Sequence, residues 1–82
     1  MQRSYVFKVV VGDDKHEDGR KAYRAHCPEI EEAMTWGDTR EEAMRRIHEL
    51  LNALVQMRIV RGQPIPTAIP FEPFAVEVVV TV

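Results

Sequence analysis

The chain has 82 residues, with 11 lysines and arginines against 13 aspartates and glutamates, so its formal charge is −2 and its length suits one domain. Its hydrophobic share of 45% and charged share of 29% exclude disordered and collagen-like chains, and its short apolar runs exclude a membrane-spanning helix and a secretory signal. A single cysteine, Cys27, excludes an internal disulfide, so we expect a cytoplasmic domain, whose near-neutral charge argues against nucleic acid as the main partner.

Three strands are predicted in the first half of the chain. Residues 4–11 alternate with a period of two and are rich in β-branched and aromatic side chains, which is typical of a strand. The polar stretch 12–19 begins and ends with glycine and predicts a hairpin connection. The chain is expected to return as a second strand over residues 21–25. A third, shorter strand is predicted at residues 32–36 and ends at Gly37.

One helix is predicted after the third strand. Thr39 is followed three residues later by Glu42, which is the capping-box pattern of a helix start. Gly62 is a suitable C-cap, so the helix has about 22 residues and a length of roughly 33 Å. Apolar residues recur within it at steps of three and four and make one face. The residues of this face are Ala43, Ile47, Leu50, Leu51 and Leu54, with Met57 and Val60 near its end.

The chain after the helix predicts a linker and a final strand. Residues 63–73 hold four of the five prolines, which indicates a stiff surface linker, and residues 74–82 alternate as a strand. The order βββαβ predicts an α+β fold in which one helix covers one face of a four-stranded sheet. The opposite face is then more apolar than a monomer usually leaves in water, so we expect a homodimer or a higher oligomer such as a tetramer, formed through this face or through an edge strand. The residues predicted to form the oligomer interface are Val6, Val10, Ala75 and Val79, interrupted by Lys8 and Glu77.

Two motifs resemble those of the HicB-like antitoxins, a family also known as uncharacterised small bacterial and archaeal proteins. The first is YRAHCPEI at residues 23–30, which follows the glycine-containing hairpin, and the second is WGDTREEA at residues 36–43. The Pro-Ile-Pro sequence at residues 64–66 also has a counterpart in the family. The resemblance covers residues 5–82, and it departs from the family at residues 30–32, where Ile-Glu-Glu replaces the usual Leu-Pro-Gly.

This resemblance implies a partial ribonuclease H-like fold. In the toxin–antitoxin members it also implies a complex with a small HicA-type toxin, which is a messenger RNA-cleaving ribonuclease. Many members carry a C-terminal DNA-binding domain as well. The chain stops at its last predicted strand, so we expect a single domain over residues 1–82 with no C-terminal DNA-binding domain, and direct DNA binding is not expected.

The sequence predicts no enzyme. Nuclease chemistry of the ribonuclease H type needs several carboxylates around divalent metals, but the first strand offers none and the last offers only Glu77. Glu41 and Glu42 are explained by the preference of a helix start for acidic residues. The histidines and the cysteine match no zinc spacing, so we expect no catalytic residue, no metal site and no cofactor. These residues are His16, His26, Cys27 and His48.

Charge and one aromatic side chain give the candidate partner surface. Residues 13–32 carry a net charge of −3, and residues 40–61 carry +2. The acidic part predicts a surface complementary to a basic RNA-binding protein. Trp36 is either a core anchor or an interface residue, and its position favours the core. The leading hypothesis is an antitoxin-like module that covers the RNA site of a toxin. The alternatives are a toxin-less oligomer with a structural or small-ligand role, and nucleic-acid binding through the helix arginines. The predicted partner-binding residues are Glu29, Glu31, Glu32 and Trp36.

Overall fold

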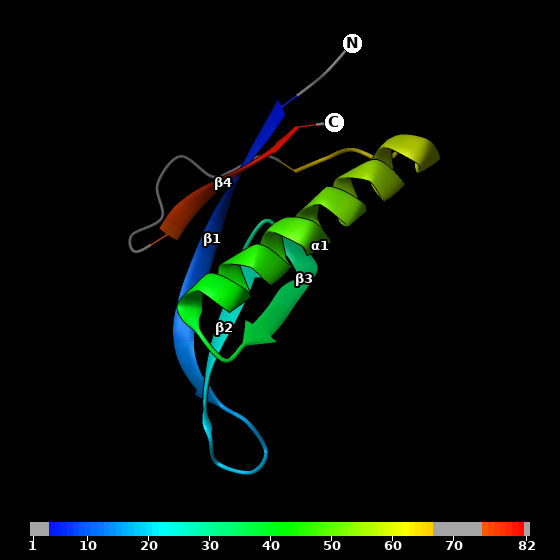
Figure 1. Cartoon of the computed structure of the whole chain (residues 1–82). Coiled ribbons are helices and arrows are strands. Elements are labelled where there is room, and N and C mark those ends of the chain that lie inside the picture. The colour runs from blue at the N-terminus through cyan, green and yellow to red at the C-terminus, as the bar shows by residue number, and fades with distance from the viewer. Residues whose placement is uncertain (1–3, 67–74, 82) are drawn as a thin grey trace.

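A computed structural model describes residues 4–66 and 75–81 of the chain. One four-stranded antiparallel sheet carries a single helix on one face (Figure 1), which confirms the predicted βββαβ order and the α+β class. The strands lie in the order β3-β2-β1-β4, so β3 and β4 are the two edges of the sheet. The elements are β1 (Ser4–Lys15), β2 (Lys21–Cys27), β3 (Ile30–Gly37), α1 (Arg40–Arg61) and β4 (Ala75–Thr81).

The hairpin between β1 and β2 is longer in its strands and shorter in its turn than predicted. The pairing of β1 with β2 continues through Gly12, Asp13 and Asp14 to Lys15, because a two-stranded ribbon tolerates polar side chains as long as the backbone bonds are made. The turn itself is closed by the amide of His16, which donates to the carbonyl of Arg20 over 2.8 Å. The prediction that residues 12–19 form one connection was therefore wrong in its first half.

Helix α1 begins and ends where its capping residues predict. The Thr39 hydroxyl accepts a hydrogen bond of 3.0 Å from the Glu42 amide, and Gly62 adopts the left-handed conformation with φ 67°. The Glu42 carboxylate pairs with Arg46 at 2.8 Å. The buried stripe is narrower than predicted, since Val60 is 86% exposed, and the predicted stripe omitted Val55. The buried helix residues are Ala43, Ile47, Leu51 and Val55.

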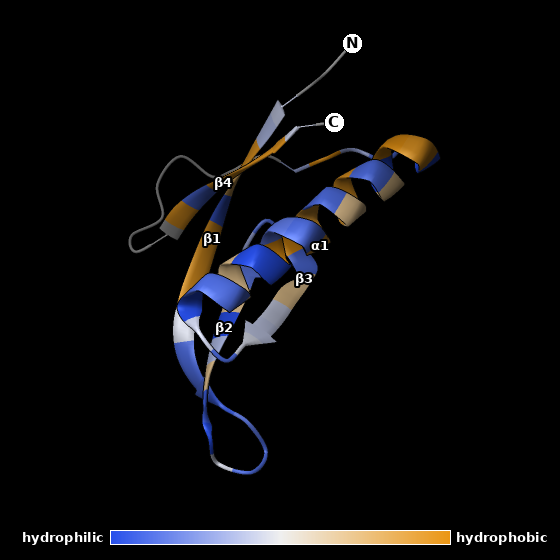
Figure 2. Cartoon of the chain, viewed as in Figure 1, coloured by the Kyte–Doolittle hydropathy of each residue, from blue (hydrophilic) through white to orange (hydrophobic). Residues whose placement is uncertain are grey.

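The core lies between α1 and the sheet face that α1 covers. The register pairs Phe7 with Val78, and these two side chains are buried together with Val9 and Val80. The odd-numbered side chains Phe7 and Val9 of β1 therefore face the helix. Figure 2 shows the outward side of α1 as mainly hydrophilic, whereas its last turn, which projects past the sheet, is hydrophobic. In the described part of the chain, no helix has the length and apolarity needed to cross a bilayer.

Candidate functional site

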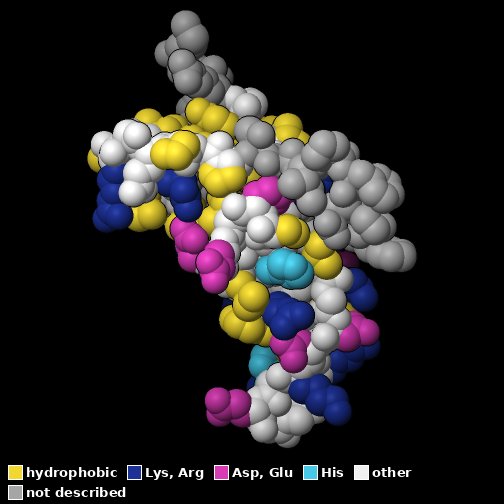
Figure 3. All heavy atoms as spheres, turned by 180° about the vertical axis from the view of Figure 1, so that it is seen from behind, with side chains coloured by type: hydrophobic (Ala, Val, Ile, Leu, Met, Phe, Trp, Pro, Cys, Tyr) yellow, Lys and Arg dark blue, Asp and Glu magenta, His cyan; other side chains and the backbone are white. Residues whose placement is uncertain are grey.

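The sheet face opposite α1 carries exposed hydrophobic side chains in groups, with charged and histidine side chains between them (Figure 3). On β1 and β4 the register places Val6 beside Val79, and both are exposed. The next row holds Lys8 beside Glu77, joined by an ion pair of 3.0 Å. Val10 is half-buried. The structure thus brings Val6, Val10 and Val79 onto the face predicted for an oligomer interface. Ala75 lies opposite Val10, and its side chain is outside the described part.

The other half of this face is built by β2 and β3. His26 lies between Val10 and Met34, and the following row places Arg24 beside Trp36. Met34 is 40% exposed and Trp36 is 42% exposed, so two large apolar side chains project from the edge strand β3. Met34 is not among the predicted partner-binding residues. Its separation from Trp36 by two residues is the signal that the two share a face.

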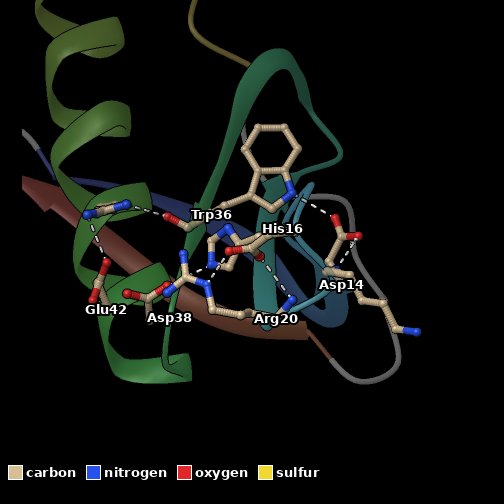
Figure 4. Close-up of polar contacts among 9 residues, drawn as sticks. Asp14, His16, Arg20, Trp36, Asp38 and Glu42 are labelled. Carbon is tan, nitrogen blue, oxygen red and sulfur yellow. Dashed lines mark hydrogen bonds and ion pairs between the residues drawn. The ribbon is translucent and has the colours of Figure 1, made fainter.

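Trp36 is held in a fixed orientation, although it is not in the core (Figure 4). Its indole Nε1 donates to Asp14 Oδ2 over 2.7 Å, and Arg46 donates to its backbone carbonyl over 2.9 Å. The indole hydrogen bond is the main cause that lowers the pKa of Asp14, with a smaller contribution from the Lys15 amide. The preference for a core position of Trp36 was wrong, because the side chain projects from the uncovered face. An exposed aromatic residue with a fixed ring suits a binding surface.

The acidic charges of the hairpin are largely paired within the chain. His16 Nε2 lies 2.7 Å from Asp38 Oδ1, which ties the turn to the start of α1 (Figure 4). Asp13 lies 3.5 Å from Arg40. Asp18 pairs with Arg20 at 2.7 Å, and its pKa is lowered by the hydrogen bond from the Arg20 amide and then by this side-chain contact. His16 lies next to this polar turn, yet it is half-buried and bonded.

The acidic segment that runs from the turn after β2 into β3 contains the three predicted glutamates in three different environments. Glu29 is half-buried and accepts a hydrogen bond of 3.0 Å from the Cys27 thiol. Burial, followed by this bond, raises the pKa of Cys27 to about 12. Glu32 pairs with Arg58 at 2.9 Å, and its pKa is lowered by a backbone hydrogen bond and then by Arg58. Glu31 is exposed, and no ion pair involves it among the described residues.

Of the four predicted partner residues, three lie on β3 and Glu29 lies in the turn before it, so they do not form one cluster. The hairpin and the turn at Glu29 are at opposite ends of β2, so the two acidic segments do not form a single surface. Glu31 and Trp36 are five positions apart on β3, which corresponds to roughly 16 Å. Their common feature is the edge strand β3. This strand presents a carboxylate near its start and two apolar side chains further along.

A shallow groove of about 340 Å³ lies between α1 and β4. Its polar side chains are Arg45, His48 and Glu77, and His48 Nε2 lies 3.1 Å from the carbonyl oxygen of Val79. The sequence gives no signal for this contact, because His48 and Val79 are 31 positions apart. Over residues 4–66 and 75–81, no group of three or more histidine, cysteine or acidic side chains could hold a metal ion.

The chain is similar to UPF0150 protein ssr1765 of Synechocystis sp. The two sequences are 33% identical over 61 residues, which is 74% of this chain and 75% of the relative. The name of this relative states no activity. No family model matches the chain. No solved structure matches it either.

Proposed function

The chain belongs to the UPF0150 family, and we propose that it is a cytoplasmic protein-binding module of the antitoxin type. In this proposal it neutralises a small HicA-type, messenger RNA-cleaving ribonuclease by covering the RNA site of that toxin. The HicB-like motifs support the proposal through their place in the fold. The first motif runs through β2 into the turn, and the second runs from the end of β3 into α1, so together they enclose the edge strand β3.

The observation that carries the proposal is the exposure of Met34 and Trp36 on β3. Tryptophan is enriched at the energetic centres of protein interfaces, and methionine adapts to varied partner surfaces. The Trp36 ring is already oriented by its bond to Asp14, so less side-chain entropy is lost when a partner covers it. A fixed apolar anchor on an exposed edge favours a protein partner over a small ligand.

The charges along β3 suit a basic partner. A ribonuclease that grips the RNA backbone presents lysine and arginine at its binding surface. Glu31 is free to attract such a surface, and the lowered pKa of Glu32 keeps that carboxylate ionised beside Arg58. Electrostatic attraction of this kind mainly speeds association and excludes wrong partners. We therefore assign recognition to Glu31 and the binding free energy to Trp36.

Co-expression with a small, basic HicA-type ribonuclease tests the proposal. Purification is expected to yield a complex, and growth is expected to be rescued. Trp36→Ala is expected to cost about 2 kcal/mol, or roughly 30-fold in Kd. Glu31→Lys is expected to slow association, whereas Glu17→Lys, at the far end of β2, is the matched control and is expected to have no effect. No complex, or equal effects of the two glutamate variants, would contradict the proposal.

A second candidate is a toxin-less homo-oligomer with a structural or small-ligand role. The exposed pair of Val6 and Val79 favours self-association, and Arg45 and His48 give the groove beside β4 some capacity for polar ligands. The Trp36→Ala variant distinguishes the two candidates, because Trp36 lies on β3 and the groove lies beside β4, at the opposite edge of the sheet. With this substitution a toxin-less oligomer keeps its mass and its ligand affinity, whereas an antitoxin binds its toxin more weakly.

A further inference from the structure

Strand β4 forms a regular edge of the sheet on which no other strand of residues 4–66 and 75–81 pairs, and we propose that it pairs with β4 of a second copy of this chain. All seven residues of β4 pair with β1 without a shift, its sequence AVEVVVT contains no proline, and its single charge is Glu77. Natural edge strands usually carry bulges, prolines or several charges that prevent pairing. The opposite edge has such a device, since the pairing of β2 with β3 shifts between His26 and Cys27. This proposal does not depend on the antitoxin role.

The free hydrogen-bonding groups of β4 can be assigned from one contact. The carbonyl of Val79 accepts from His48, which lies on α1 and not on β1, so this carbonyl points away from β1. In an antiparallel strand every second residue directs both its amide and its carbonyl to the same side. Glu77 and Thr81 therefore direct their backbone groups outward as well. A carbonyl oxygen has two lone pairs, so the His48 contact is compatible with an added strand.

The space beside this edge suits the side chains of an incoming strand. The groove of about 340 Å³ runs between α1 and β4 and has Met44, His48 and Val78 among its walls. Val76 belongs to the face that α1 covers, because it pairs with Val9, yet it is 49% exposed. An added strand would place valines against both the groove and Val76. The groove has apolar walls at Met44 and Val78 and is open at the edge, so it can take side chains of an added strand.

The strand is complementary to itself in one register. An antiparallel pair centred on Val78 uses the whole of β4, with Glu77 opposite Val79 of the second copy and Val76 opposite Val80 of the second copy. Such a pair makes roughly eight backbone hydrogen bonds. Shifting the centre to Glu77 would set the two Glu77 carboxylates opposite each other, which is destabilising, and would leave residues unpaired. In the full-length register the exposed Val79 side chains of the two copies are diagonal neighbours.

The strand that pairs with β4 is therefore β4 of a second copy of this chain, and not a strand from another protein. A two-fold axis at Val78 matches apolar residues with apolar residues on the side of α1. On the other face it gives each Glu77 an uncharged neighbour across the axis while its own Lys8 neutralises it. Because β3 is the other edge of the sheet, this pairing leaves the surface around Trp36 accessible. A dimer with one continuous eight-stranded sheet follows from joining the two four-stranded sheets.

The test combines solution mass with a pair of variants at one position. Light scattering of the full chain at high micromolar concentration is expected to give the mass of a dimer. Val79→Pro removes only an outward amide, which an edge strand tolerates, and is expected to raise the dimer dissociation constant by about 100-fold. Val79→Thr keeps that amide but makes the side chain polar, and it is expected to remain a dimer. Circular dichroism checks that both variants are folded.

Amide hydrogen exchange of the wild-type chain gives a second readout that needs no variant. The amides of Glu77 and Val79 are expected to be protected at high concentration and to exchange quickly on dilution, whereas Val78 and Val80, bonded to β1, stay protected throughout. A monomer at high concentration overturns the proposal, as does a dimer that Val79→Thr dissociates, because that result assigns the interface to the sheet face. Edge amides that are protected only after another protein is added also overturn it.

Discussion

Replacing Gly37 by alanine is expected to destabilise the fold strongly, although the change adds a single methyl group. Gly37 ends β3, and only Asp38 and Thr39 separate it from α1. A Cβ atom at this position would lie 2.6 Å from the amide nitrogen of Ala43 and 3.0 Å from the carbonyl carbon of Glu42. Both atoms belong to the backbone of the first helical turn. The methyl group therefore cannot be accommodated by turning a side chain.

The size of the loss in folding stability follows from the element that has to move, which is α1. Relieving the contact requires α1 to shift away from β3, which loosens the Thr39 cap and the packing of Ala43 and Ile47. Inserting a methyl group into a packed site costs about 1–3 kcal/mol, and an unyielding backbone neighbour places Gly37→Ala at the upper end. A chain of this length has a total stability of about 4–12 kcal/mol. The melting temperature is then expected to fall by about 10–20 °C.

Urea unfolding monitored by circular dichroism measures this effect, with Gly12→Ala as the matched control. Gly12 also lies in a strand, and nothing lies within 4 Å of a Cβ atom placed there. Both substitutions reduce the conformational freedom of the unfolded chain by the same amount, so Gly12→Ala is expected to be neutral or slightly stabilising. The difference between the two midpoints isolates the steric cost. Equal midpoints would refute the close approach of β3 and α1.

Further outcomes are expected at Thr39, Cys27 and Trp36. Thr39→Ala removes the side-chain cap on the Glu42 amide and should cost about 1 kcal/mol in urea unfolding, whereas Thr39→Ser should not. The native Cys27 thiol should resist alkylation near neutral pH and react only in denaturant. Its pKa of about 12, against an ordinary 9.0, means that the folded state holds this proton longer than the unfolded state. Stability should therefore fall as the pH rises from about 9 to 12, and a Cys27→Ala variant should lose that part of the pH dependence. Trp36→Phe removes the indole donor and should raise the pKa of Asp14 toward 3.8 in an NMR titration; an unchanged titration would exclude the bond as the cause.

The helix was predictable because its boundaries are set by local chemistry. A threonine cap three residues before Glu42, and a glycine that adopts a left-handed conformation, act within one turn of the chain. The end of β1 was not predictable in the same way. Its hydrophobic alternation stops at Val11, but the backbone pairing continues to Lys15. Periodicity reports the burial of side chains, and a polar ribbon that extends beyond the core has no such signal.

The candidate surface was only partly predictable, because β3 is irregular. Ile30 and Ala33 are both buried although they are three residues apart, and the pairing of β2 with β3 shifts between His26 and Cys27. An alternation counted along the sequence cannot anticipate such a shift. The prediction of a core position for Trp36 therefore depended on its residue type, which favours burial. The pairing of acidic residues with distant arginines could not be predicted for another reason, because it depends on how α1 crosses the sheet.

The two edges of the sheet differ in a way that separates their roles. β3 is irregular, and it presents a free carboxylate and a fixed aromatic ring, which favour recognition of another protein through side chains. β4 is regular and nearly uncharged, and its outward backbone groups favour recognition through hydrogen bonds between strands. Because β2 and β1 lie between these edges, a partner on β3 does not compete with a second copy on β4. A small chain of this kind can enlarge its sheet by self-pairing and still keep one binding surface per copy.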